Sequence, residues 1–119
     1  MNSLFKNNHL IFDVTEKTFD SLVIEASHQQ IVLVDFWADW CAPCRMLTPV
    51  LEKLVQQYQG QWLLAKVEVD DNMHLAGNYQ LRGFPTVLLF DKGEIIERFS
   101  GYKPHHWVSD LLNQNLQGA

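Results

Sequence analysis

Both cysteines of the chain lie within residues 37–45 and are spaced as Cys41-x-x-Cys44. This segment follows an apolar stretch typical of a strand and begins a stretch typical of a helix. Helical residues three apart share a face, so the two sulfur atoms can meet and form a disulfide. The N–H groups that open a helix stabilise a thiolate, which lowers its pKa and makes it a nucleophile at neutral pH. The pattern therefore predicts a reversible two-electron redox pair.

The two cysteines are expected to have different roles. Cys41 falls at the junction of strand and helix, where a residue caps the helix. Pro43 has no N–H, so the amide of Cys44 is the natural donor toward the Cys41 sulfur. Cys41 is also nearer the solvent end than Cys44, which lies one turn into the helix. We expect Cys41 to attack a substrate disulfide and Cys44 to break the resulting mixed disulfide.

The alternative for such a pair is half of a zinc site. Zinc normally takes four ligands, and the chain has no second cysteine pair. None of the histidines forms a spaced pair that would complete such a site: His9, His28, His74, His105 and His106. The position of the pair between a strand and a helix favours redox chemistry, with no metal and no bound cofactor.

Alternating strand-like and helix-like segments predict an α/β fold with a mixed central sheet covered by helices on both faces. Strands are expected at residues 9–13, 31–37, 62–69, 86–90 and 94–99, and helices at 42–58, 72–79 and 104–116. Thr15 can cap a further helix, in which Phe19, Leu22, Val23 and Ala26 have helical spacing. The short link Asp91-Lys92-Gly93 makes the last two strands an antiparallel hairpin.

Length and composition limit the classes of protein to which the chain can belong. Its 119 residues, 47% of them hydrophobic and 19% charged, indicate one globular domain at 9–119 after an N-terminal extension at 1–8. The net charge of −5 gives little support to nucleic-acid binding, and no apolar run approaches the roughly 20 residues that span a membrane. Residues 10–12 are too short for the apolar region of a signal peptide, so we expect a cytoplasmic protein.

From end to end, the chain resembles a bacterial-type thioredoxin. The similarity covers about residues 9–116, and the matching motifs follow one another in the order and at the spacing typical of the family. It is carried by Val34-Asp35-Phe36-Trp37-Ala38, Trp40-Cys41-Ala42-Pro43-Cys44, Pro49, Ala65-Lys66-Val67, Asp70, Arg82-Gly83-Phe84-Pro85-Thr86 and Gly93. The resemblance implies a thioredoxin fold, with four to five strands flanked by four helices, and a protein-disulfide reductase. It also implies client proteins that contain disulfides and electrons from an NADPH-dependent thioredoxin reductase. We expect the protein to be a monomer.

Asp35 interrupts an otherwise apolar strand, where an isolated carboxylate is costly to bury. Burial raises the pKa of a carboxyl group, and such a group can transfer protons at neutral pH. The resemblance places Asp35 beneath Cys44, with Lys66 close by, as the base that deprotonates the resolving thiol. The alternative is an aspartate at the end of a strand that reaches water.

The resemblance also implies a client-binding surface around the cysteines. In the family, the proline at position 85 is cis and packs across from the two sulfur atoms. The backbone around Phe84 can then pair with an extended client segment as an added strand. Trp40, in the loop before Cys41, is expected to be exposed, whereas Trp37 is expected to pack. The expected client-binding residues are Trp40, Ala42, Pro43, Gly83, Phe84, Pro85 and Gly101.

Some residues depart from the family pattern, and some segments also resemble a related class of protein. Ala42 replaces a usual glycine, Arg45 a usual lysine, and Phe84 a smaller aliphatic residue, which affects substrate range and reduction potential. Residues 47–58 and 64–66, with Phe99, also resemble the thioredoxin-like domain of bacterial chaperedoxins, which hold unfolding clients. Those proteins usually continue into a helical-repeat region, which this sequence does not show. We expect a reductase, because the missing repeats and the intact cysteine pair both favour one. Net oxidation or isomerisation would need an oxidising compartment.

Overall fold

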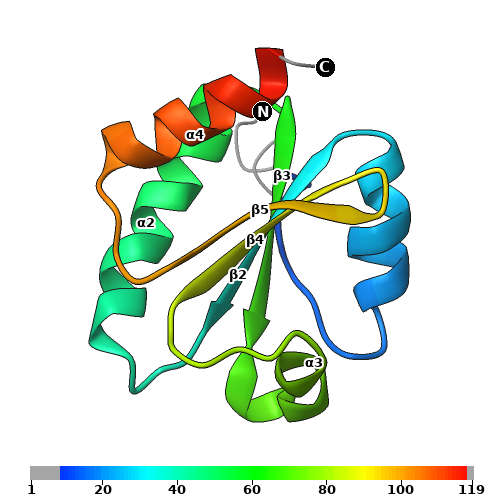
Figure 1. Ribbon diagram of the computed structural model, residues 1–119, viewed down its shortest axis with the longest axis vertical. Coiled ribbons are helices and arrows are strands. Elements are labelled where there is room, and N and C mark those ends of the chain that lie inside the picture. The colour runs from blue at the N-terminus through cyan, green and yellow to red at the C-terminus, as the bar shows by residue number, and fades with distance from the viewer. Residues whose placement is uncertain (1–8, 118–119) are drawn as a thin grey trace.

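A five-stranded mixed sheet forms the centre of the computed structural model, which describes residues 9–117 (Figure 1). The strand order is β1-β3-β2-β4-β5. The bounds are β1 Ile11–Asp13, β2 Ile31–Trp37, β3 Trp62–Glu68, β4 Thr86–Asp91 and β5 Glu94–Ser100. β3 is parallel to β1 and β2, whereas β4 is antiparallel to β2 and β5. The predicted α/β sheet and its C-terminal hairpin are confirmed, and the predicted extension at 1–8 lies outside the described residues.

Helices cover both faces of the sheet. Their bounds are η1 Asp20–Glu25, η2 Ala26–His28, α2 Ala42–Gln57, η3 Val69–Asp71, α3 Met73–Asn78 and α4 His105–Gln117. α2 and α4 lie side by side on one face, and the segment with η1 lies across the sheet from them (Figure 1). Within residues 9–117, no helix has both the length and the apolar character needed to cross a membrane.

The first helical segment differs from the helix predicted to begin at Thr15. The Thr15 hydroxyl accepts the N–H of Lys17 at 3.3 Å in a turn at residues 16–18, and this turn leads directly into the helical segment. The helical run begins at Asp20 and is wound first as a π-helix and then as a 3₁₀-helix. At its end, the Ser27 hydroxyl accepts the N–H of Gly93 at 2.7 Å, which ties the segment to the β4–β5 turn. Apolar spacing marks the buried side of such a segment but does not report how tightly it is wound.

β2 is the strand that positions the site, because α2 begins a few residues beyond its end. Its first six residues are buried, and the side chains on the α2 face include Leu33 and Asp35. In the parallel register with β3, Asp35 lies opposite Lys66, so the two side chains project from the same face of the sheet. The sheet therefore presents a carboxylate and an ammonium group beneath the first turns of α2.

Candidate active site

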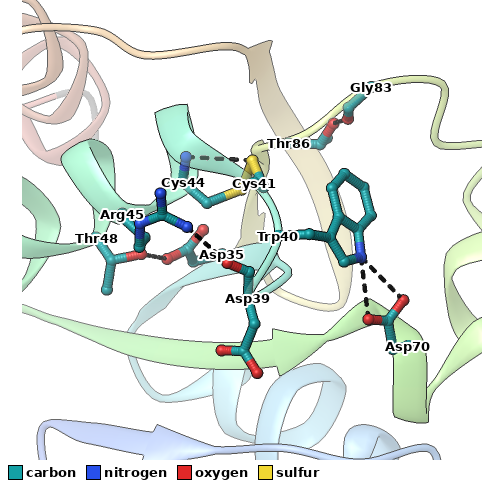
Figure 2. The surroundings of a disulfide bond; sticks show 10 residues. All are labelled: Asp35, Asp39, Trp40, Cys41, Cys44, Arg45, Thr48, Asp70, Gly83 and Thr86. Atoms are coloured by element: carbon teal, nitrogen blue, oxygen red, sulfur yellow. Dashed lines mark hydrogen bonds between the residues drawn. A yellow bond between two sulfur atoms is a disulfide. The ribbon is translucent and has the colours of Figure 1, made fainter.

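Cys41 and Cys44 form a disulfide at the start of α2, with their Cα atoms 5.3 Å apart (Figure 2). Cys41 is the N-cap residue, and its sulfur accepts the N–H of Cys44 at 3.2 Å. The predicted cap and its predicted donor are both confirmed. In the part of the chain from 9 to 117, no three or more His, Cys, Asp or Glu side chains are grouped so as to hold a metal ion.

The two cysteines differ little in exposure. Cys41 is 4% exposed and Cys44 1%, so both are buried in the disulfide form. The expectation that Cys41 lies nearer to solvent is met only by this small margin. The clearer difference is the hydrogen bond, because the Cys44 N–H points at the Cys41 sulfur and would stabilise negative charge there.

Arg45 ties the start of α2 to the loop before it. Its guanidinium donates to the carbonyl oxygen of Asp39 at 2.7 Å (Figure 2). The N–H of Cys41 donates to the carbonyl of Ala38 at 3.1 Å in the same loop. These bonds hold the loop against the first turn of α2 and so fix the position of the Cys41 sulfur.

Asp35 is fully buried and does not reach water, so the alternative of a strand-end aspartate is wrong. The Thr48 hydroxyl donates to its Oδ2 at 2.7 Å (Figure 2), whereas Oδ1 has no hydrogen-bond partner among the described residues. Burial raises the pKa of Asp35 from 3.8 to about 6, against the lowering effects of the Thr48 hydrogen bond and the Lys66 charge. The carboxyl group can therefore gain and lose a proton near neutral pH.

Lys66 lies opposite Asp35 in the sheet, but its side chain donates a hydrogen bond to Glu52 rather than to Asp35. Its Nζ donates to Oε2 of Glu52 at 3.1 Å, and both side chains are partly exposed. The Lys66 charge still lowers the pKa of Asp35, and the Glu52 charge raises it. Lys66 is thus brought to the site as a charge near the carboxylate rather than as its hydrogen-bond partner.

The sequence reasoning missed Thr48 and Glu52. Together with Cys44 they form a row at i, i+4 and i+8 on α2, so all three lie along one side of the helix. The available signal was the presence of two polar residues on a helix whose neighbouring residues Leu47 and Leu51 are fully buried. The spacing alone indicates a polar strip beside Cys44, although not its partners on the sheet.

A cavity of about 250 Å³ opens beside this row. Its walls are Trp37, Cys44, Arg45, Thr48, Pro49 and Lys66. Cys44, the hydroxyl group that donates to Asp35 and the ammonium group of Lys66 therefore border one space. Trp37 is a wall of this cavity and packs against the core, as predicted.

Trp40 is 64% exposed, which confirms the expectation for this loop. Its indole Nε1 donates to the Asp70 carboxylate, at 3.0 Å to Oδ2 and 3.3 Å to Oδ1 (Figure 2). The Trp40 and Phe84 rings meet edge to face, with centroids 6.1 Å apart. Asp70 thus holds an exposed aromatic ring in place, a contact that the sequence reasoning did not anticipate.

The segment at residues 83–86 contains the cis proline that the resemblance implied. The Phe84–Pro85 peptide bond is cis, and the Pro85 carbonyl accepts the N–H of Gly101 at 2.9 Å. Gly101 has a φ of +85°, a conformation that favours glycine. The Thr86 hydroxyl donates to the Gly83 carbonyl at 2.6 Å (Figure 2), which closes the turn before β4.

The predicted client-binding residues do not all share one environment. Ala42 and Pro43 are exposed at the first turn of α2, and Gly83 is exposed in the segment at residues 83–86. Phe84 is partly buried against Trp40. Pro85 differs, because its side chain is buried. The exposed members are thus Trp40, Ala42 and Pro43, next to Cys41 in the chain, and Gly83 in the turn before β4.

Asp35→Asn is expected to stabilise the protein by about 3 kcal/mol above pH 7. Each pKa unit corresponds to about 1.4 kcal/mol, and the pKa of Asp35 is raised from 3.8 to about 6. The folded state therefore binds more protons than the unfolded state between these values, so the unfolding free energy falls as pH rises through this range. The gain from asparagine should be full above about pH 7, shrink as the pH falls through 6, and vanish below about pH 4. Urea unfolding of the oxidised protein at several pH values measures it.

Asp110→Asn, at an exposed position on α4, is the matched control for this stability prediction. It removes the same charge from the surface and should change the unfolding free energy by less than about 0.5 kcal/mol. A constant gain for Asp35→Asn from pH 4 to pH 8 would contradict the raised pKa of Asp35.

Comparisons with known proteins all match this chain to thioredoxins. The family model described as Thioredoxin matches residues 10–114. The thioredoxin of Bacillus subtilis (strain 168) is 38% identical over 89% of this chain and 98% of its own length. The thioredoxin of Chlorobaculum thiosulfatiphilum is 36% identical over 88% of this chain and 95% of its own. These matches favour an oxidoreductase over the alternative of a client-holding module.

Proposed function

This chain belongs to the thioredoxin family and is a thiol-disulfide oxidoreductase, and from that premise we propose that it reduces disulfide bonds in client proteins. Cys41 is the attacking sulfur and Cys44 the resolving one. The observation that carries this assignment is the hydrogen bond from the Cys44 N–H to the Cys41 sulfur at the start of α2. Such a donor favours a thiolate at Cys41 once the disulfide is reduced.

The proposed reaction proceeds in two exchange steps. The Cys41 thiolate attacks one sulfur of the client disulfide, forms a mixed disulfide and releases the other client sulfur as a thiolate. Cys44 then loses its proton and attacks the Cys41 sulfur, which breaks the mixed disulfide and releases the second client thiolate. The client gains two electrons and, after protonation, two thiols. The protein loses two electrons and ends with the Cys41–Cys44 disulfide.

We assign Asp35 as the base that accepts the Cys44 proton. It is fully buried beneath α2, and Thr48, its hydrogen-bond partner, lies one turn beyond Cys44 on that helix. A base works best when its pKa lies near the operating pH, and burial raises the pKa of Asp35 to about 6. Lys66 acts through its charge, which favours the ionised carboxylate. No bound cofactor takes part in either exchange step.

The oxidised protein needs a source of two electrons. We propose an NADPH-dependent thioredoxin reductase for this role, and a reducing compartment such as the cytoplasm, where structural disulfides are rare. Similarity to thioredoxins over 88–89% of the chain supports this partner. The protein is expected to act as a monomer.

The client-binding surface includes Trp40 and Phe84, whose rings meet beside the disulfide. Trp40→Ala is expected to lower kcat/KM for a protein disulfide by about tenfold, because exposed tryptophans at the centre of an interface often contribute more than 1 kcal/mol. The loss should fall mainly on KM, since the sulfur chemistry is unchanged. Insulin reduction at varied concentration measures both constants.

Leu22→Ala is the matched control for the Trp40 substitution. Leu22 is also partly exposed, at 38%, but lies in η1 on the other face of the sheet. It should leave kcat/KM within about twofold of the unchanged protein. Equal losses for both variants would show that Trp40 has no specific part in client binding.

The proposed direction of electron flow is tested by the reduction potential. The reduction potential of a reductase must be lower than that of proteins that isomerise or introduce disulfides. The potentials of those proteins lie between about −180 and −120 mV. We expect equilibration against glutathione to give a value below about −220 mV, together with rapid insulin reduction supported by NADPH and a thioredoxin reductase. A potential above about −180 mV would indicate net oxidation or isomerisation instead.

A further inference from the structure

The hydroxyl group of Thr48 is the one side-chain donor to Asp35 among the described residues. It lies 2.7 Å from Oδ2, whereas Oδ1 has no hydrogen-bond partner in that part of the chain. Asp35 is fully buried, so no bulk water competes for this contact. A carboxylate held by one oxygen has a defined orientation, and its second oxygen is the atom left to exchange a proton.

The charged and titratable groups around Asp35 come from two elements. From α2 these are Cys44 and Glu52, and from β3 the group is Lys66. On the β4 side, the register partner of Asp35 is the apolar Val87. Lys66 donates its hydrogen bond to Glu52 and not to Asp35, so it does not fix the direction of the carboxylate. Thr48 is the group left to do so.

Thr48 also stands in the right place relative to the reacting sulfur. It follows Cys44 by four residues on α2, so the two side chains lie on one side of the helix, one above the other. Both border the cavity of about 250 Å³ beside the disulfide. A carboxylate held at Thr48 is therefore held one helical turn from the thiol that must lose its proton.

We propose that Thr48 is a positioning residue for the resolving step: its hydroxyl holds Asp35 by Oδ2 and leaves Oδ1 to accept the proton of Cys44. This inference rests on the proposed role of Asp35 as the base. In the step, the Cys44 proton passes to Oδ1, and the Cys44 thiolate attacks the Cys41 sulfur and displaces the client thiolate. Thr48 keeps its own proton throughout and only donates a hydrogen bond.

A hydrogen bond to a carboxylate favours its charged form, so the loss of the hydroxyl should raise the pKa of Asp35. Thr48→Val removes the hydroxyl and keeps the branched shape of the side chain. We expect the Asp35 midpoint, followed by carboxyl ¹³C NMR, to move up by about 1 pH unit. The acid limb of the pH profile for resolving a mixed disulfide should move with it. The rate should fall about fivefold at pH 6 and hardly at all at pH 8.5.

Thr48→Ser keeps a hydroxyl group at the same place and should restore both the midpoint and the pH profile. Thr48→Ala is the second variant without a hydroxyl, and it serves if the valine variant does not fold. An unchanged Asp35 midpoint in the valine and alanine variants would overturn the proposal. A loss of rate that is the same at every pH would also overturn it, because it would indicate a structural role alone.

Asp35→Asn separates failure of this inference from failure of the proposed function. If Asp35 is the base, the asparagine variant loses the acid limb of the resolution profile. Loss of that limb in Asp35→Asn, with an unaffected Thr48→Val, would refute only the role of Thr48. An unchanged profile in Asp35→Asn would refute Asp35 as the base, and the role of Thr48 with it.

Discussion

Replacing Cys41 with serine is expected to lower the rate of insulin reduction at least about 10³-fold, to the uncatalysed background. Serine cannot form a disulfide, and its hydroxyl is not ionised at neutral pH, so the first exchange step is lost. The N–H of Cys44 would still point at position 41, but with no thiolate to stabilise. Turnover of insulin with NADPH and a thioredoxin reductase measures the effect.

Loss of folding must be separated from loss of the nucleophile in this variant. The matched control is the unchanged protein in its reduced form, which also lacks the disulfide that Cys41→Ser cannot form. The two should unfold at similar denaturant concentrations. If Cys41→Ser still reduced insulin at a rate near that of the unchanged protein, Cys44 or another group would be the nucleophile.

Replacing Cys44 with serine is expected to stop the reaction one step later. Cys41 can still attack the client, but no second thiol is present to break the mixed disulfide. Steady-state turnover should therefore fall about as far as in Cys41→Ser, while a covalent adduct accumulates at one client per chain. Mass spectrometry under non-reducing conditions detects the adduct, and dithiothreitol should release it.

Together, the two single variants show which sulfur atom attacks the client and which one resolves the mixed disulfide. Cys41→Ser/Cys44→Ser is the control for nonspecific capture and should form no adduct. An adduct that formed in Cys41→Ser but not in Cys44→Ser would reverse the assigned roles. Such a result would leave the family and the redox pair unchanged.

The segment that carries the chemistry was predictable because its determinants are local. Cys41, Pro43 and Cys44 lie within four residues, and their spacing alone predicts the cap, its donor and the disulfide. Asp35 stands out by its place in a strand that is otherwise apolar, whereas its position beneath Cys44 and its role as a base were implied by the resemblance to thioredoxins. A charged residue within a buried, apolar strand is costly, and such an exception often marks a functional site. The expected cost of about 3 kcal/mol for its ionised form is consistent with such a role.

The contacts that tune the site were not predictable, because they join segments far apart in the chain. Thr48 reaches Asp35 across 13 positions, and Trp40 reaches Asp70 across 30. Whether a polar side chain on a helix faces a carboxylate or water depends on how α2 lies on the sheet, which residue spacing does not specify. The same reason explains why the bond between Lys66 and Glu52 was not anticipated.

The winding of the first helical segment has a similar origin. The buried positions Phe19 and Val23 were marked correctly by their spacing. The late start and the π and 3₁₀ winding accompany contacts such as that from Ser27 to Gly93, which lies 66 positions away. Local propensity is a weak guide where tertiary contacts hold the end of an element.

Selective alkylation of the reduced protein tests the central claim most directly. A short exposure to less than one equivalent of iodoacetamide at pH 7, followed by fragmentation of the peptide that holds both cysteines, reports which sulfur reacts first. The account predicts that most of the label lies on Cys41, because the Cys44 N–H supports a thiolate there. Label found mainly on Cys44, or shared equally between the two, would contradict it.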